Sequence, residues 1–117
     1  MRLDAGDIAL LPFPYADLTT TKRRPTLVLT PASYHQAHPD AVVAYMTSQP
    51  QRGPWTLRID ADDLASGRIP LDSWVRVDRL ATVDRRLVRR VAGRVRPEAL
   101  AHARGKLLRL LGARPHR

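Results

Sequence analysis

Residues 6–30, GDIALLPFPYADLTTTKRRPTLVLT, contain two strand patterns separated by a polar, threonine-rich loop. The first pattern, residues 7–13, is mostly apolar, and the second, residues 26–30, is a short run of leucine and β-branched residues. Three consecutive cations at positions 22–24 stand just before the second strand. Because like charges repel, this placement indicates an anionic ligand, and phosphate suits the bidentate donors of guanidinium.

The rest of the chain continues as short segments that alternate or run apolar. Further strands are expected over residues 41–47, 55–60, 73–80 and 92–95. Residues 31–40 form a connection that can hold one helical turn, and residues 62–70 are rich in turn residues. Five or six short strands with tight links predict a small, coiled, mostly antiparallel sheet or partly open barrel.

Two helices are expected in the last third of the chain. Asp84 can cap a short helix over residues 85–91, whose arginines at 85, 86, 89 and 90 would share one face. Pro97 stands where a first helical residue should. The apolar stripe of this C-terminal helix consists of Leu100, Ala103, Leu107, Leu108 and Leu111, and Gly112 closes it.

Length and composition favour one soluble domain over residues 1–117, with 44% hydrophobic residues. The chain has no cysteine, which excludes disulfides and cysteine-based zinc sites. Neither a membrane-spanning run nor a signal peptide is expected, so the default location is the cytoplasm.

The net charge of +9 is unevenly distributed. Residues 1–60 carry six Lys or Arg against five Asp or Glu, whereas residues 61–117 carry fourteen against six. Arginine-biased codon usage is one explanation, since only two of the twenty cations are lysines. A field of this sign attracts nucleic acid in either case.

Familiar catalytic motifs are missing from the sequence. It contains no GxSxG elbow, P-loop or GxGxxG, and Glu98 is its one glutamate. His35, His38 and Asp40 imitate a metal cluster, but they lie in a proline-bounded surface connection without a third strong ligand. No metal and no cofactor is therefore expected.

Two strand ends carry the polar groups that remain. Arg24 precedes one strand and Thr47 ends another, so the two converge at one sheet edge if these strands are neighbours. A guanidinium beside a hydroxyl can hold a phosphodiester and stabilise extra negative charge in a transition state. The structural alternative is an ion pair of Arg24 with Asp17 or Asp78, with Thr47 only ending its strand.

Three aromatic residues, Tyr45, Trp55 and Trp74, are candidate stacking surfaces for single-stranded bases. The alternation of residues 73–77 puts Trp74 on the same side as Arg76 and opposite Val75. The alternative for each aromatic residue is packing in the core or in a dimer interface.

Read together, four motifs resemble the MazF/PemK family of toxin endoribonucleases from bacterial toxin–antitoxin systems. They are Gly6-Asp7, Lys22-Arg23-Arg24-Pro25, Thr47-Ser48-Gln49 and the run SWVRVD at residues 73–78. The resemblance extends from about Gly6 to Leu111. It implies a small SH3-like barrel with a C-terminal helix, acting as a homodimer that a MazE-like acidic antitoxin silences.

The resemblance also implies metal-independent cleavage of single-stranded RNA, usually mRNA, to 2′,3′-cyclic phosphate and 5′-hydroxyl ends. The family's catalytic pair falls on Arg24 and Thr47. Six further residues are expected to shape the RNA groove: Lys22, Arg23, Ser48, Gln49, Ser73 and Arg79.

Two departures from the family pattern concern base recognition. The glycine-rich loop of many members is replaced by TTTKR at residues 19–23, and a carboxylate–glutamine pair appears as Asp78-Arg79. The cleavage sequence is therefore not carried over. Two other functions stay open: a non-catalytic RNA- or protein-binding module on the same barrel, and a gyrase-poisoning toxin like the CcdB family.

Overall fold

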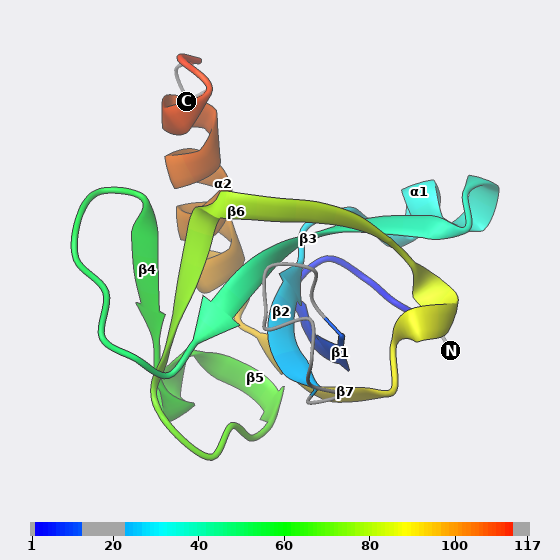
Figure 1. Cartoon of the computed structure of the whole chain (residues 1–117), viewed down its shortest axis with the longest axis horizontal. Coiled ribbons are helices and arrows are strands. Elements are labelled where there is room, and N and C mark those ends of the chain that lie inside the picture. The colour runs from blue at the N-terminus through cyan, green and yellow to red at the C-terminus, as the bar shows by residue number, and fades with distance from the viewer. Residues whose placement is uncertain (1, 13–22, 114–117) are drawn as a thin grey trace.

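The computed structural model describes residues 2–12 and 23–113. The strands of this part form one curled antiparallel sheet in the order β4-β6-β3-β2-β1-β7-β5 (Figure 1). They are β1 (Asp7–Leu11), β2 (Arg24–Val28), β3 (Asp40–Thr47), β4 (Thr56–Ile59), β5 (Leu64–Gly67), β6 (Ser73–Asp84) and β7 (Arg90–Val95). This mostly β architecture with a C-terminal helix confirms the predicted fold class.

The curled sheet buries apolar residues on both of its faces. Leu27 of β2 and Ala44 of β3 lie opposite each other and belong to a first apolar cluster. Their neighbours Val28 and Val43 also lie opposite each other and belong to a second cluster on the other face. Alternate side chains point to opposite faces of a strand, so both sets of side chains must be apolar in the middle of β3. This explains the continuous apolar run at residues 41–47.

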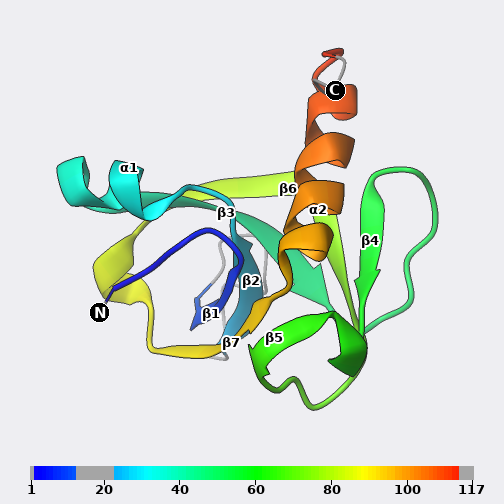
Figure 2. The same ribbon diagram turned by 180° about the vertical axis from the view of Figure 1, so that it is seen from behind.

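Helix α2 (Pro97–Leu110) covers the first cluster and lies against β4 and β6 (Figure 2). It begins at Pro97 as predicted, but its buried stripe is displaced from the predicted one. Ala99 and Ala103 are its buried residues. Leu108 and Leu111, which were expected in the stripe, are exposed by 38% and 69%. No helix within the described ranges is long and apolar enough to cross a membrane.

The N-terminal segment is fastened to the short helix α1 (Ala32–Ala37). Leu3 is buried in the second cluster, and the Asp4 carboxylate accepts a hydrogen bond from the Ala32 backbone N–H at 3.0 Å. This bond, followed by one from the Ala5 backbone, lowers the pKa of Asp4. His35 was expected on the surface, but it is buried between the Leu3 carbonyl (2.9 Å) and the Thr30 hydroxyl (2.8 Å).

Strand β6 is longer than predicted and bends sharply in its middle (Figure 1). Its register with β3 jumps from Tyr45↔Arg76 to Ala44↔Leu80, so residues 77–79 have no partner on β3. Such a bulge bends a strand and re-aims its side chains. The bend lets one strand pair with β4 at its start and run along β3 to its end.

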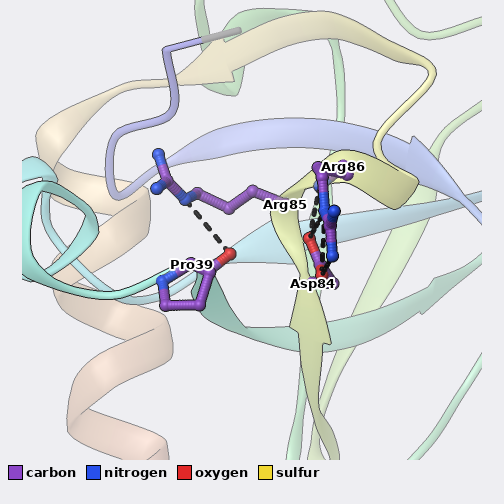
Figure 3. A network of polar contacts seen from close by, with 4 residues as sticks. All are labelled: Pro39, Asp84, Arg85 and Arg86. Atoms are coloured by element: carbon purple, nitrogen blue, oxygen red, sulfur yellow. Dashed lines mark hydrogen bonds and ion pairs between the residues drawn. The ribbon is translucent and has the colours of Figure 1, made fainter.

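The helix predicted over residues 85–91 is wrong. Only the 3₁₀ turn η2 (Arg85–Leu87) forms, because Arg90 and Val91 pair with β1 instead. Asp84 does cap this turn, through its carboxylate and the Arg86 backbone N–H at 2.8 Å. Figure 3 shows the same carboxylate against the Arg86 guanidinium, while the Arg85 Nε donates to the Pro39 carbonyl at 3.2 Å.

The turn-rich segment 62–70 contains more regular structure than predicted. A 3₁₀ turn, η1 (Ala61–Asp63), leads directly into β5, which pairs with β7 at the end of the sheet. Asp60 caps this turn, accepting from the Asp62 backbone N–H at 2.9 Å.

Candidate functional site

Neighbouring strands bring Arg24 and Thr47 to one place on the sheet. Strands β2 and β3 pair antiparallel, with Thr26 opposite Tyr45. The pairing ends at these two residues. Arg24, the first residue of β2, and Thr47, the last residue of β3, each lie two residues beyond it, at the same end of the two strands. Residues two apart on a strand point to the same face, so Arg24 and Thr47 stand at neighbouring strand ends on one face of the sheet.

Thr47 begins a row of opposed residues that crosses from β3 over β6 to β4. Thr47 lies opposite Trp74, and Trp74 lies opposite Arg58. The parallel row two residues away contains Tyr45 and Arg76, also opposite each other. Arginine, hydroxyl and aromatic groups therefore gather on one face of three adjacent strands. This polar face consists of Tyr45, Thr47, Arg58, Trp74 and Arg76.

The Thr47 hydroxyl can still donate a hydrogen bond. Its oxygen accepts one from the Gln49 backbone N–H at 3.2 Å, just after the strand ends. A threonine hydroxyl has one donor and two acceptor positions, so this contact leaves its proton available. The bond also holds the hydroxyl oxygen in place at the end of β3.

The Arg24 guanidinium carries a polar atom that the described residues do not satisfy. Its Nε is buried and has no hydrogen-bond partner within the described part of the chain. An unpaired buried donor costs about 1–3 kcal/mol, and more when it is charged. A bound oxyanion would satisfy this donor, because guanidinium binds phosphate through two parallel N–H groups.

Arg76 and Asp78 add an ion pair that the sequence did not identify as functional. Arg76 Nη2 lies 2.9 Å from one Asp78 carboxylate oxygen, and Arg76 Nε lies 3.2 Å from the other. Asp78 was considered as a structural partner of Arg24, but its carboxylate is bound by Arg76. The spacing of two residues is a weak signal by itself, because any two residues so spaced on a strand share a face.

The structure places the other predicted groove residues differently. Arg23, Ser48, Gln49 and Arg79 are exposed. Ser73 is buried and donates its hydroxyl to the Leu71 carbonyl at 3.2 Å, so it does not join the polar face. Lys22 and Asp17 lie outside the described residues. Among the residues described, no three His, Cys, Asp or Glu side chains gather into a possible metal site.

Solved structures of toxins share this architecture. A MazE–MazF complex from Deinococcus radiodurans has 30% identity, a TM-score of 0.76 and coverage of 97% of this chain and 99% of that chain. MazF from the same organism has 29% identity, a TM-score of 0.73 and coverage of 96% and 98%. An endoribonuclease in complex with its cognate antitoxin, from a mycobacterial species, has 18% identity, a TM-score of 0.78 and coverage of 98% and 99%.

The sequence itself shows the same relationship. No curated protein is significantly similar to the chain. The model of the PemK-like, MazF-like toxins of type II toxin–antitoxin systems, however, matches residues 4–111. This match spans nearly all of the curled sheet and α2, including both strand ends of the candidate site. The chain therefore belongs to the PemK-like, MazF-like toxin family of type II toxin–antitoxin systems.

Proposed function

We propose that this protein is a metal-independent endoribonuclease that cleaves single-stranded RNA, chiefly mRNA, at short sequences. The observation that carries the proposal is that Arg24, whose buried Nε has no partner among the described residues, and Thr47 stand at neighbouring ends of the paired strands β2 and β3. Membership of a toxin family and similarity to structures of MazF and of an endoribonuclease support the same activity.

The reaction is a transfer of the phosphodiester to the neighbouring ribose hydroxyl. The 2′-oxygen attacks the phosphorus in line, the bond from phosphorus to the 5′-oxygen breaks, and the products are a 2′,3′-cyclic phosphate and a 5′-hydroxyl. Negative charge grows on the non-bridging oxygens during the attack. Arg24 stabilises this charge, and the Thr47 hydroxyl donates a hydrogen bond to one of the same oxygens.

The attacking 2′-hydroxyl must lose its proton, and water takes it, because Asp78 stands four residues beyond Trp74 on β6, about 13 Å along the strand from the row of Thr47. The Asp78 carboxylate is instead bound by two hydrogen bonds from Arg76, which shares the polar face with Thr47. Arginine itself is a poor proton acceptor or donor, because its pKa is above about 12. The 5′-oxygen therefore takes its proton from water.

The antitoxin partner follows from charge and from the relatives. The D. radiodurans toxin has been solved as a MazE–MazF complex. The net charge of +9 on this chain suits an acidic antitoxin segment lying over the basic face. The homodimer stays a prediction from the resemblance, and the cytoplasmic location stays a prediction from the sequence.

Metal-free cleavage tests the proposal directly. Purified protein is incubated in EDTA with a long single-stranded RNA, and the new ends are mapped. The wild type should cut at a recurring short sequence and leave cyclic phosphate ends. Arg24→Ala should lose at least about 100-fold in rate, as expected for an oxyanion-binding group. Asp78→Asn should cut at close to the wild-type rate, because this carboxylate lies away from the row of Thr47.

A remote arginine provides the matched control for these variants. Arg109 is exposed near the end of α2, so Arg109→Ala removes one positive charge without touching the polar face. It should cleave at the wild-type rate. Intact RNA with a folded wild type would refute the ribonuclease, and the binding module and the gyrase poison would then be tested by gel shift and gyrase assay.

A further inference from the structure

The chain's two tryptophans differ in what they contact. Trp55 packs against the first apolar cluster, and its carbonyl accepts a hydrogen bond from the Val77 backbone N–H at 3.0 Å. Trp74 is half-buried and belongs to neither apolar cluster of the described residues. A large aromatic side chain that does not contribute to the core needs another explanation, because aromatic residues usually dominate core packing.

The surroundings of Trp74 are polar and cationic. It lies directly between Thr47 of β3 and Arg58 of β4, and Arg76 follows two residues later on the same face of β6. Asp72 pairs with Arg58, and Asp78 pairs with Arg76, so each arginine of these rows has a carboxylate partner. Opposed Cβ atoms are about 5 Å apart, which puts the indole one strand from Thr47 and two from Arg24.

We propose that Trp74 is the stacking platform for the base next to the scissile phosphate. This inference rests on the proposed function, because it takes the phosphate to lie between Arg24 and Thr47. Successive phosphates of an extended strand are about 6–7 Å apart, and each base has a π-face that an indole can cover. The base that follows the phosphate therefore reaches the indole one strand away.

Stacking explains this residue better than recognition of base edges. An indole offers one N–H donor and otherwise a flat apolar surface, which binds any base. Trp74 therefore increases affinity and positions the RNA strand, while other groups set the cleavage sequence. Its loss should raise KM more than it lowers kcat, because stacking holds the substrate before and during the reaction alike.

Tryptophan fluorescence tests the contact without cleavage. Trp55→Phe leaves Trp74 as the sole tryptophan, and Trp74→Phe leaves Trp55. Each is titrated with single-stranded DNA, which keeps bases and phosphates but lacks the attacking 2′-hydroxyl. DNA should quench the emission of Trp74 and leave that of Trp55 unchanged. Inorganic polyphosphate, which has phosphates and no bases, should compete with the DNA without quenching either.

The affinity of substituted proteins gives the second measurement. Trp74→Ala should weaken DNA binding by between about 5-fold and about 100-fold, and Trp74→Phe should recover most of it. Two outcomes would refute the stacking role of Trp74 without refuting the ribonuclease. One is Trp74 emission that stays unquenched when DNA is bound, and the other is a Trp74→Ala protein that binds DNA as tightly as the wild type. A Trp74→Ala protein that changes its oligomeric state in sedimentation shows that the indole packs against a second copy, and also refutes the stacking role. A wild type that neither binds DNA nor cleaves RNA refutes the proposed function itself.

Discussion

Gly67, at the end of β5, lies where two strand backbones touch. Its φ is +73°, and a Cβ added there would lie 2.2 Å from the Ala92 carbonyl oxygen of β7. Left-handed backbone alone costs a non-glycine residue about 1–2 kcal/mol. Because the clash adds to this strain, Gly67→Ala should lower the free energy of unfolding by more than about 2 kcal/mol, measured by urea denaturation.

Gly112 offers the matched control for that substitution. It has a similar φ of +81°, but a Cβ there meets nothing within 4 Å. Gly112→Ala should therefore cost only the backbone strain of about 1–2 kcal/mol. If both substitutions lowered the free energy of unfolding equally, β5 and β7 would be able to move apart around the added Cβ at little cost.

The Asp84 side chain makes part of the stability depend on pH. Hydrogen bonds from the Arg86 side chain, and then from the Arg86 backbone, lower the pKa of Asp84 from 3.8 to about 2. Because the folded-state pKa is the lower one, the carboxylate stabilises the fold above about pH 4, and this contribution is lost as the pH falls toward 2.

The difference in unfolding free energy between the wild type and Asp84→Asn isolates this effect. Asparagine keeps a capping oxygen but has no charge, so the wild-type advantage should be constant from pH 5 to 7 and shrink between pH 4 and 2. Arg86→Gln should remove most of the same pH dependence. A difference that stays constant down to pH 2 would show that Arg86 does not hold the carboxylate.

At the residue scale, the sequence could select Arg24 and Thr47 as candidates because both stand at predicted strand ends. It could not show that the Arg24 Nε is buried without a partner among the described residues, or that Asp78 pairs with Arg76. Both features depend on how side chains pack, which the strand pattern does not specify. Ser73 shows the reverse effect, since its hydroxyl is turned to the Leu71 carbonyl although its neighbour Trp74 lies on the polar face.

At the element scale, prediction succeeded where local pattern and tertiary pairing agree. Strands β1, β3 and β4 and helix α2 each have the periodicity of their final structure. Strand β5 was missed because Leu64-Ala65-Ser66-Gly67 has little intrinsic strand preference and forms by pairing with β7. The helix over 85–91 was wrong for the related reason that β1 recruits Arg90 and Val91 into the sheet.

Helix α2 allows a direct test of which side is buried. Ala103 is 0% exposed, whereas Ala101, on the same helix, is exposed. The substitution of each by glutamine changes helix propensity equally, so the difference reports on packing. Ala103→Gln should lower the free energy of unfolding by about 1–3 kcal/mol, and Ala101→Gln should stay within about 0.5 kcal/mol. Chemical denaturation of both variants measures the difference, and equal values would contradict the burial of Ala103.

At the scale of the whole molecule, one bent strand links the core to the site. The first half of β6 carries Trp74 and Arg76 beside Thr47, while its second half runs along β3 to the basic turn η2. The composition indicated an excess of positive charge in the second half of the chain, but it could not say where the sheet would put that charge. The fold places part of it on the polar face and part of it at residues 85–90.

Arg89 and Arg90, which lie outside the polar face, should bind nucleic acid through its phosphates and without regard to its sequence. Arg89 and Arg90 are exposed where η2 leads into β7. Each phosphate contact adds about 0.7 to the slope of log K against log salt for a single strand. Substituting both with glutamine should weaken binding to unrelated single strands alike and reduce this slope by up to about 1.4. The mapped cleavage sites should not move, because we expect base choice to depend on groups near Arg24 and Thr47 rather than on these two arginines or on Trp74. A changed cleavage sequence in the doubly substituted protein would show instead that this basic edge lies within the substrate groove.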